Sequence, residues 1–476
     1  MNGLDVVVVG GGISGLVAAH SLRKDGAAVT LVEASSRLGG KVLTEIDEGF
    51  LIESGPDSFV AGKGSVLALA AELGLTESVI ATRPENRGSY VWWEGRLHPL
   101  PDGLLLMAPS RLGPLLGSSL LSWPGKLRVL ADLVLPRRNE PGDESLQSFV
   151  ERRLGHEVLE RIAEPLIAGI HAAEPSTMSL QASFPRFLQM EQDHRSLILA
   201  ARAAASRRPG SGSSHFASFE RGMGQLTGAL SEALAGADIR TDVSVTGLAH
   251  GDGAYQLRLD RGTALRADGV VLATPSVVTA DLLSGISPPA AHALAGIHQV
   301  ATSVVTLAFR THQLPPLSGS GFVVPAAQAR HIMGVSYLSR KWRGRVPDQG
   351  FELLRVFVGG PHGQDLALAG EDRLLGVALD ELEAMLGIAA KPARTWAHPW
   401  EGGLHQYTLG HTNRVSTAEA ALAAHPGLAL AGGAFHGIGL NECIDSGRRA
   451  AVSVLESSTD RGRSERVAPL TPPGRN

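Results

Sequence analysis

The sequence predicts an α/β protein with a parallel sheet built from separate parts of the chain, a second mixed sheet and a group of helices. Three observations carry this prediction. Valine-rich apolar runs flank a glycine turn within the first 33 residues, as in buried parallel strands. Similar apolar runs return after residue 215 and again near residue 428. Between residues 101 and 215, helical spacing and chain-breaking prolines replace the strand-like pattern.

The first motif is a glycine turn between an apolar run and a helix-like run. It consists of Gly10, Gly11, Gly12, Ile13, Ser14 and Gly15. The first glycine permits a tight turn, the second lets a pyrophosphate approach the backbone, and the third lets the helix pack on the strand. The N–H groups and partial charge at the helix start favour phosphate. With Glu33 placed for the ribose hydroxyls, the pattern predicts a Rossmann-like dinucleotide site, whereas the glycines alone would fit an ordinary loop.

Three further segments are placed to meet the same ligand. After the second strand, Arg37 offers a cation to phosphate, although the segment could equally be a polar turn. The strand before Gly55 ends in a Gly-Pro turn that would admit a flat ring, although Gly-Pro alone marks only a turn. A last helix beginning near Gly439 would direct its positive end at the pyrimidine edge of a flavin, unless it is an ordinary capped helix.

Composition excludes several classes of protein. The hydrophobic content of 43%, the charged content of 19% and the net charge of −4 are ordinary for a soluble globular protein and predict no nucleic-acid partner. The single cysteine, Cys443, excludes an intrachain disulfide, and no basic segment precedes the first strand, so we expect no signal peptide and a cytoplasmic protein.

The histidines lack metal-ligand spacing, so no metal is expected. No catalytic residue is predicted, because no nucleophile motif is present and a bound cofactor would supply the chemistry.

The domain organisation follows from these patterns. We expect the dinucleotide domain to comprise residues 1–83, 216–282 and 424–456, including strands near residues 239–245, 255–259 and 270–274 that join the first sheet. The other expected parts are a substrate domain of residues 84–100 and 283–423, a helical subdomain of residues 101–215, and a flexible tail of residues 457–476. Prolines interrupt the apolar stretch 104–135, which excludes an ordinary transmembrane helix and leaves either an amphipathic contact surface or a helical core.

Three segments together resemble one family. They are Gly55-Pro56-Asp57-Ser58, the run from Gln406 to His411, and the run from Gly437 to Ile444. With the N-terminal motifs, they make the chain similar to the porphyrinogen oxidases of haem synthesis, within the FAD-dependent amine oxidase-like superfamily. The resemblance covers nearly the whole chain and implies non-covalently bound FAD. The FAD residues it implies are Gly10, Gly11, Gly12, Ile13, Ser14, Gly15, Glu33, Ala34, Arg37, Gly40, Lys41, Gly55, Pro56, Asp57, Ser58, Val245, Ile438, Gly439 and Leu440.

The resemblance also implies a reaction. A porphyrinogen would lie between the flavin and the second domain and give hydride to the flavin, which molecular oxygen would reoxidise. The substrate-binding positions it implies are Arg87, Gly169, Val323 and Trp342. The chain departs from the family where an arginine often precedes the aromatic residue at Tyr90, because Ser89 stands there and Arg87 lies two residues earlier. It departs again in the segment 169–174, which here contains His171.

The resemblance leaves alternatives open. The Gly-Pro-Asp-Ser-Phe run and the segment 97–101 are closest to the soluble Gram-positive branch, which favours coproporphyrinogen III over protoporphyrinogen IX. The rivals are a flavin amine oxidase, a carotenoid-desaturase-like enzyme and a flavin-binding regulatory protein. The first usually needs two facing aromatic residues, whereas the last helix region offers only Phe435. Contact with a membrane surface or another haem-pathway enzyme, and an oligomeric state, are open as well.

Overall fold

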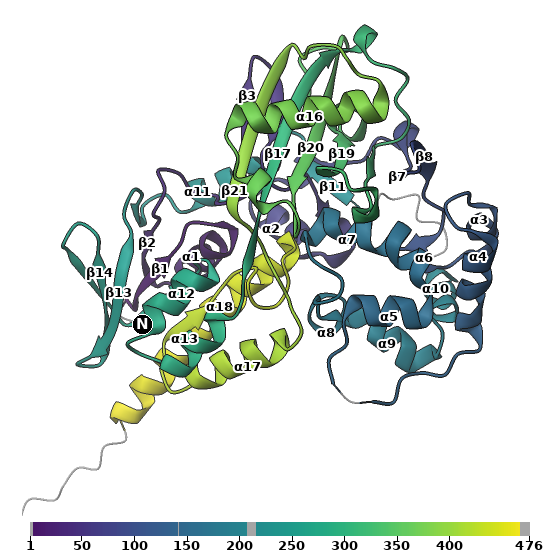
Figure 1. Ribbon diagram of the computed structural model, residues 1–476. Coiled ribbons are helices and arrows are strands. Elements are labelled where there is room, and N and C mark those ends of the chain that lie inside the picture. Colours follow the sequence, from purple (N-terminus) through teal and green to yellow (C-terminus); the bar gives the residue numbers. More distant parts are fainter. Residues whose placement is uncertain (1–2, 141, 207–215, 467–476) are drawn as a thin grey trace, which may run out of the picture.

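A computed structural model describes residues 3–140, 142–206 and 216–466 of the chain. Within this part, three groups of elements surround a common centre: a parallel sheet with its helices, a larger mixed sheet, and a group of short helices (Figure 1). The last helix, in yellow, runs along the first group and toward the centre. The expected α/β architecture with a separate helical part is confirmed.

The parallel sheet takes its strands from three distant parts of the chain. Its order is β12-β2-β1-β16-β22, and every pairing is parallel. The strands are β1 (Asp5–Val9), β2 (Ala28–Val32), β12 (Asp238–Arg240), β16 (Gly269–Leu272) and β22 (Leu428–Leu430). The helices packed with it include α1 (Ile13–Lys24), α2 (Ser65–Glu72), α11 (Gly224–Ala233) and α18 (Leu440–Arg466). The discontinuous Rossmann-like domain is therefore confirmed.

Two expectations about this domain were wrong. Strands β13 (Val245–Gly251), β14 (Ala254–Leu259) and β15 (Ala264–Ala267) form a separate antiparallel sheet. Exposed residues alternate along β14, because its other face is open, whereas a strand inside a covered parallel sheet is buried on both faces. The last helix was expected to end near Leu455, but it continues to Arg466.

Small elements surround the parallel sheet. They are β3 (Thr44–Asp47), β4 (Phe50–Glu53), β5 (Phe59–Val60), β6 (Val79–Ala81) and β11 (Phe216–Phe219), and the helices α12 (Ser276–Leu283), α13 (Pro288–Ala295) and α17 (His411–Leu422). Helices α13 and α17 were expected in the substrate domain. They pack instead in one apolar core with the parallel sheet, where Leu294 and Val415 lie with Val7.

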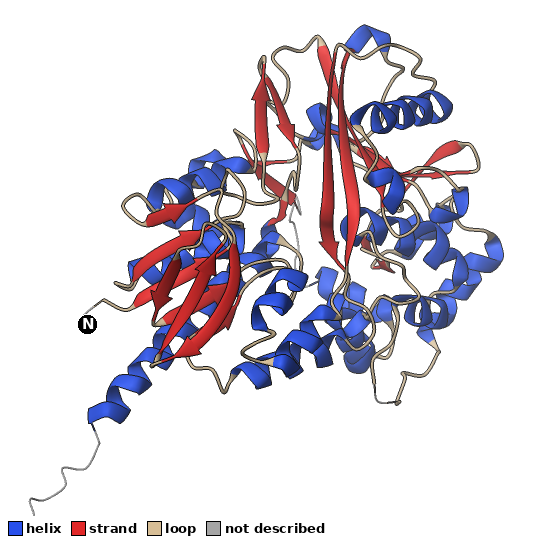
Figure 2. Cartoon of the chain, turned by 60° about the vertical axis from the view of Figure 1, so that its left-hand side comes forward, coloured by secondary structure: helices blue, strands red, loops and turns tan. Residues whose placement is uncertain are grey.

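The second sheet is mixed, as expected. Its order is β21-β17-β20-β19-β18-β7-β8, with β18 and β7 parallel and the other pairs antiparallel. The strands are β7 (Tyr90–Trp93), β8 (Arg96–Pro99), β17 (Gln299–Arg310), β18 (Gly321–Val323), β19 (Ile332–Tyr337), β20 (Phe351–Gly359) and β21 (Arg394–His405). Its longest strands are tall arrows in Figure 2, and α16 (Glu371–Leu386) covers one face. Helices α14 (Leu338–Lys341) and α15 (Gln364–Ala367) flank it.

The helical subdomain has a core of its own. Leu115, Leu120 and Val129 of the apolar stretch 104–135 are buried there with Phe149 and Ile162, so these residues belong to a helical core. Its elements are β9 (Leu104–Leu105), β10 (Ala108–Pro109), α3 (Leu112–Gly117), α4 (Trp123–Leu130), α5 (Leu146–Arg153), α6 (His156–Val158), α7 (Glu164–His171), α8 (Leu180–Ser183), α9 (Pro185–His194) and α10 (Leu197–Ser206). None of the helices in residues 3–140, 142–206 and 216–466 is long and apolar enough to span a bilayer.

Candidate functional site

The glycine turn has the geometry that the motif predicts. Gly10 has φ +105°, a conformation that side chains disfavour. A Cβ atom at Gly15 would lie 1.9 Å from the Gly10 carbonyl oxygen, so helix α1 can start only where this residue is glycine. A Cβ atom at Gly12 would meet nothing within 4 Å. The turn is therefore closed on the protein side and open at Gly12, as a phosphate-binding turn requires.

Helix α1 directs its start at this open side. Its N-cap, Gly12, has no side-chain hydrogen bond, so the first N–H groups are left for a ligand. The Ser14 hydroxyl is engaged elsewhere, since it donates to the Cys443 carbonyl over 2.9 Å. Helix α18 crosses α1 closely at Gly447, where a Cβ atom would lie 2.4 Å from the Ser14 carbonyl oxygen. The two ends of the chain thus form one side of the site.

Glu33 lies at the end of β2, as predicted. Its carboxylate accepts hydrogen bonds from the N–H of Gly11 at 2.6 Å and from the N–H and hydroxyl of Ser35 at 2.8 and 2.7 Å. These bonds fix its orientation and leave acceptor capacity on the oxygen that Gly11 contacts. The backbone of Val243 donates to the Glu33 carbonyl, which brings Val245 and the start of β13 to the same edge. The predicted ribose and adenine positions are therefore neighbours.

The loop after Glu33 returns across the glycine turn. The Arg37 guanidinium donates to the Gly40 carbonyl at 2.7 Å and so closes the loop. A Cβ atom at Gly40 would lie 3.0 Å from Gly12 Cα, and one at Gly55 would lie 1.7 Å from the Lys41 carbonyl oxygen. The chain therefore forms one continuous wall from Gly12 to Gly55, with close backbone approaches that larger residues would prevent.

Two basic side chains of this wall are held with lowered pKa values. Burial lowers the pKa of Lys41 to about 8, and it also lowers the pKa of His405 to about 3, with the Lys41 charge adding to the second effect. The Nδ1 atom of His405 is buried without a partner among the described residues. His405 is thus a neutral imidazole beside an ammonium group at the end of β21. No motif in the sequence indicates that Lys41 and His405 lie close to each other.

Helix α18 begins at Leu440, where the last motif predicted it. Asn441 anchors the first turn, because its side-chain oxygen accepts from the N–H of Val66 and its nitrogen donates to the Val60 carbonyl, both at 3.0 Å. Ile438 and Leu440 are half-buried and Gly439 is exposed at the helix start. The anchored helix start faces the region between the glycine turn and the mixed sheet, where its partial positive charge is available.

The loop before α18 is held by Tyr407 and His411. The Tyr407 hydroxyl donates to the Gly433 carbonyl at 3.0 Å and accepts from the N–H of Gly437 at 2.6 Å. The two rings stack with centroids 3.8 Å apart, and His411 Nε2 lies 3.0 Å from the Phe435 carbonyl oxygen. Burial raises the pKa of the Tyr407 phenol, so it remains a neutral donor and acceptor. Both residues lie in the run from Gln406 to His411 that resembles the family, but no role was predicted for either of them.

Asp57 and Ser58 turn their side chains away from the wall toward the mixed sheet. The Asp57 carboxylate accepts from Lys341 Nζ at 2.8 Å and from the Trp342 indole at 3.1 Å. Burial alone would raise the pKa of Asp57, but Lys341 and Arg355 outweigh it and hold the pKa well below its usual range. Only the backbone at Gly55 and Pro56 remains to face a ligand.

Trp342 does not form an open wall, contrary to its predicted substrate position. Its side chain is fully buried and packs with Phe50 and Ile52 of strand β4. The indole N–H needs a buried acceptor, and Asp57 supplies it. Trp342 therefore joins the two sheets and is removed from the candidate substrate residues.

A cavity of about 830 Å³ lies between the helical subdomain and the mixed sheet. Val324 and Met333 of the sheet and Leu159 and Ala173 of the helical part are among its lining residues. The neighbouring Val323 is half-buried against the core of the helical subdomain, and Gly169 lies in helix α7. Arg87 is exposed at the end of a short turn before β7 and is already engaged with another group. Val323 thus lies beside the lining residue Val324, whereas Arg87 is not among the lining residues, and the substrate roles of Arg87, Gly169 and Val323 stay predictions.

Acidic groups line one side of the cavity. Glu164 accepts from the N–H of Ala326 at 3.1 Å, and Glu174 lies 2.9 Å from His362. Burial raises the pKa of Glu164 to about 7, and the charges of Glu174 and Glu160 add to the rise. No cluster suited to a metal ion occurs in residues 3–140, 142–206 and 216–466.

These features fit a flavin dinucleotide. The open Cβ position at Gly12, the free helix start, the oriented Glu33 carboxylate and the close backbone wall to Gly55 form a cradle with one phosphate end and one ring end. Two further contributors were missed by the sequence reasoning. The Trp400 indole donates to the Ser54 carbonyl at 2.8 Å, and the Arg355 guanidinium donates to the Gly55 carbonyl. Neither residue lies in a motif, so only the fold could reveal them.

The fold and the cradle define a flavin-dependent oxidoreductase. The family model for flavin-containing amine oxidoreductases matches residues 13–455, and the chain belongs to this family. It is 37% identical to a coproporphyrinogen III oxidase of Propionibacterium freudenreichii over 95% of this chain and 91% of that one. It is 34% identical to a coproporphyrinogen III oxidase of Bacillus subtilis over 94% and 97%.

A solved structure agrees with these relatives. It comes from Exiguobacterium sp. 255-15 and is provisionally assigned as a protoporphyrinogen oxidase. It is 33% identical, covers 96% of this chain and 100% of that chain, and superposes with a TM-score of 0.86. The predicted family and flavin cofactor are therefore confirmed.

Proposed function

We propose that this chain oxidises a porphyrinogen to a porphyrin, with FAD as the first electron acceptor and molecular oxygen as the final one, and that coproporphyrinogen III is preferred over protoporphyrinogen IX. The observation that carries the proposal is the similarity to coproporphyrinogen III oxidases over nearly the whole length of both chains. The flavin cradle and the cavity between the helical subdomain and the mixed sheet support it, because a two-electron oxidation of a large flat substrate needs a cofactor site and a substrate pocket.

The chain's own residues would hold the cofactor in a defined orientation. The glycine turn and the start of α1 bind the pyrophosphate, and Glu33 accepts hydrogen bonds from the adenosine ribose. Lys41 and the Gly55-Pro56 backbone lie along the ring end, and the start of α18 favours negative charge there. When bound, FAD supplies the acceptance of two electrons and a proton as hydride.

The cavity would orient the tetrapyrrole and exclude water. Val324 and Leu159 offer apolar contacts to the flat rings, whereas the carboxylates Glu160, Glu164 and Glu174 repel the propionates. The propionates are therefore proposed to point away from this acidic side, toward the edge of the mixed sheet that carries Arg87. Because coproporphyrinogen III has more propionates, it gains more from such an arrangement.

The proposal includes a cytoplasmic location with a peripheral contact made through helix α4. Helix α4 and the following turn expose Trp123 by 69%, Leu127 by 66% and Val134 by 73%. Such apolar exposure supports a peripheral contact with a membrane surface or a haem-pathway enzyme. Co-sedimentation with anionic lipid vesicles tests the membrane contact, and its absence in wild type would remove it.

Comparative turnover tests the function. Both porphyrinogens are supplied to the FAD-loaded chain in air, and porphyrin fluorescence is followed. We expect both to react and coproporphyrinogen III to show the higher kcat/KM. Under anaerobic conditions the yellow absorbance should bleach on adding porphyrinogen. Unchanged absorbance would favour a regulatory flavoprotein, and bleaching by a primary amine alone would favour an amine oxidase.

The ribose contact has a test of its own. Glu33→Ala should retain less FAD through gel filtration, because it removes the oriented carboxylate. Asp238→Ala is the control, since this half-exposed carboxylate on the neighbouring strand β12 pairs with Arg240. Equal retention by both variants would contradict the role of Glu33.

A further inference from the structure

A group of five charged side chains lies beneath the Gly55 turn, where the parallel-sheet domain meets the mixed sheet. This junction cluster consists of Glu53, Asp57, Lys341, Arg345 and Arg355. Lys341 lies 2.8 Å from Asp57, and Arg345 lies 3.9 Å from Glu53. The third cation, Arg355, shares Asp57 with Lys341, since both lower the pKa of that carboxyl. The cluster therefore has one more cation than carboxylates, and its side chains are largely buried.

The two arginines of the cluster have different surroundings. Arg345 donates to the carbonyls of Glu220 and Phe219 and to the Ser218 hydroxyl, so it ties its own surroundings together. Arg355 is 3% exposed, and it donates through Nη2 to the Gly55 carbonyl. The Nε atoms of both arginines have no partner within the described chain, so the two differ in the groups that their terminal nitrogens contact. The guanidinium carbon of Arg355 lies 4.8 Å from the centroid of the Phe357 ring.

The position of Arg355 connects the excess charge to the cofactor cradle. Gly55 packs directly on Lys41, which follows Gly40 and the glycine turn. The carbonyl that Arg355 contacts is therefore part of the wall that runs along the ring end of the cradle. Buried charges are screened far less than exposed ones, so the charge of Arg355 acts strongly on groups next to the Gly55 turn.

Reduction adds negative charge to an isoalloxazine ring, so a nearby cation stabilises the reduced form more than the oxidised form. We propose that Arg355 is a positioning residue that holds the Gly55 turn and supplies the positive charge that raises the reduction potential of the bound flavin. This inference rests on the proposed FAD site. Arg355 acts through the Gly55 carbonyl and through its field. Asp57 works in the opposite direction, because its carboxylate offsets part of the cationic charge.

The test measures the potential of the bound flavin in the full-length chain. Each FAD-loaded variant is reduced under anaerobic conditions in equilibrium with a reference dye, and the ratio of reduced to oxidised flavin is read from absorbance. For Arg355→Met we expect this ratio to fall about tenfold, which corresponds to about 30 mV for a two-electron couple. Arg355→Lys should stay within about threefold of wild type, because it keeps the charge.

Two further variants sharpen the test. Asp57→Asn keeps the shape but removes a carboxylate, so the ratio should rise severalfold, opposite to Arg355→Met. Arg310→Met is the control, because this exposed arginine lies over Phe351 of the same sheet and its removal takes away the same charge. It should leave the ratio unchanged. If Arg355→Met fails to fold, the ratio of reduced to oxidised flavin in Asp57→Asn still tests whether the charge of the cluster acts on the flavin, because an unchanged ratio would overturn the inference.

The outcomes separate this inference from the proposed function. If wild type binds no FAD, the proposed function itself fails. If all variants bind FAD but Arg355→Met and Asp57→Asn leave the ratio unchanged, Arg355 has no electrostatic role and the proposed function is untouched. A loss in Arg355→Met that Arg355→Lys shares would also overturn the inference, because the effect would then come from hydrogen-bond geometry alone.

Discussion

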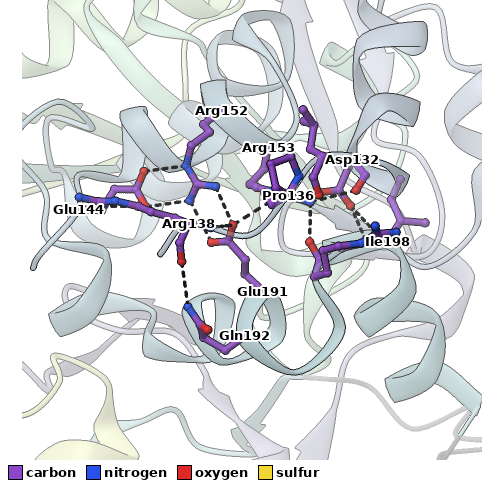
Figure 3. A network of polar contacts seen from close by, with 12 residues as sticks. Asp132, Pro136, Arg138, Glu144, Arg152, Arg153, Glu191, Gln192 and Ile198 are labelled. Atoms are coloured by element: carbon purple, nitrogen blue, oxygen red, sulfur yellow. Dashed lines mark hydrogen bonds and ion pairs between the residues drawn. The ribbon is translucent and has the colours of Figure 1, made fainter. Parts of the chain in front are cut away.

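Two buried charge clusters of this molecule differ in how completely their charges are paired. The network in the helical subdomain, shown in Figure 3, joins Asp132, Glu144 and Glu191 to Arg138, Arg152 and Arg153. Each carboxylate there has an arginine partner, and the number of cations equals the number of carboxylates. The junction cluster beneath Gly55 has one more cation than it has carboxylates. The first cluster is neutral and the second is positive.

The hydrogen bonds differ in the same way. Arg153 donates to the Asp132 carboxylate at 2.7 Å and to the carbonyls of Pro136 and Arg195 at 2.9 and 2.7 Å. The other Asp132 oxygen accepts from Ser196 at 2.6 Å and from the N–H of Ile198 at 3.0 Å. Such complete satisfaction is typical of a network that fixes a fold. In the junction cluster, by contrast, the Nε atoms of both Arg345 and Arg355 have no partner among the described residues.

Breaking the paired network should have the largest effect on stability. Arg153→Met leaves Asp132 buried without its counter-ion, and both side chains are 0% exposed. We expect the free energy of unfolding to fall by about 3–5 kcal/mol in urea denaturation followed by circular dichroism. Arg240→Met is the control, because it removes a partly exposed ion pair with Asp238 and should cost less than about 1 kcal/mol. Equal losses in the free energy of unfolding for the two variants would show that the buried network does not stabilise the packing of these helices.

Glu164 gives a smaller expected effect on stability, because it is a single partly buried carboxyl and not part of an ion-pair network. Its folded-state pKa of about 7 lies above the ordinary 4.5, so the folded chain binds the proton more tightly than the unfolded chain. Stability from this group is therefore complete below about pH 4.5 and is lost as the pH rises through 7. Glu164→Gln should remove this slope and stabilise the chain above pH 7 by at most about 3 kcal/mol, with solvent screening reducing the gain.

The pH profile of unfolding measures this effect. Wild type, Glu164→Gln and the exposed-site control Glu232→Gln are denatured in urea between pH 4 and 8. The control should follow wild type, because Glu232 lies on the outer face of α11. A profile of Glu164→Gln that parallels wild type would show that the pKa of this carboxyl is not raised in the folded chain.

The comparison also shows which parts of the site the sequence could predict. The cradle was predictable because Gly10, Gly12 and Gly15 are a local pattern whose spacing follows from backbone sterics. Arg355 and Trp400 were not predictable, because each acts on the Gly55 turn from a strand some 300 residues away. Trp342 was wrongly placed on an open wall because sequence gives the residue type but not its burial.

For the fold as well, features with a local sequence pattern were predictable and features that depend on distant partners were not. The strands of both sheets were largely found from their apolar runs, since burial on both faces leaves a local signature. The separate sheet formed by β13, β14 and β15 was missed, because pairing between strands is decided by distant partners. The cores that unite α13 and α17 with the parallel sheet were missed for the same reason.

The smallest expected effect concerns the loop before α18, which is held by the neutral side chains of Tyr407 and His411 and lies beside the cofactor cradle. Tyr407→Phe removes the hydroxyl that joins Gly433 to Gly437 and keeps the ring stacked on His411. Leaving a carbonyl and an N–H unsatisfied should cost about 1–1.5 kcal/mol in holding the loop. We therefore expect the dissociation constant of FAD to rise about tenfold, as measured by quenching of flavin fluorescence.

Tyr255→Phe provides the matched control for this prediction. Tyr255 is also fully buried, and its hydroxyl donates to the Pro426 carbonyl at 3.1 Å on the far side of the parallel sheet from the cradle. Its loss should lower stability without changing FAD affinity. If both variants weaken FAD equally, the effect comes from general loosening of the domain. If Tyr407→Phe alone weakens FAD binding, the neutral hydrogen bonds of the Tyr407 hydroxyl position the cofactor, which is a role distinct from the charge proposed for the junction cluster.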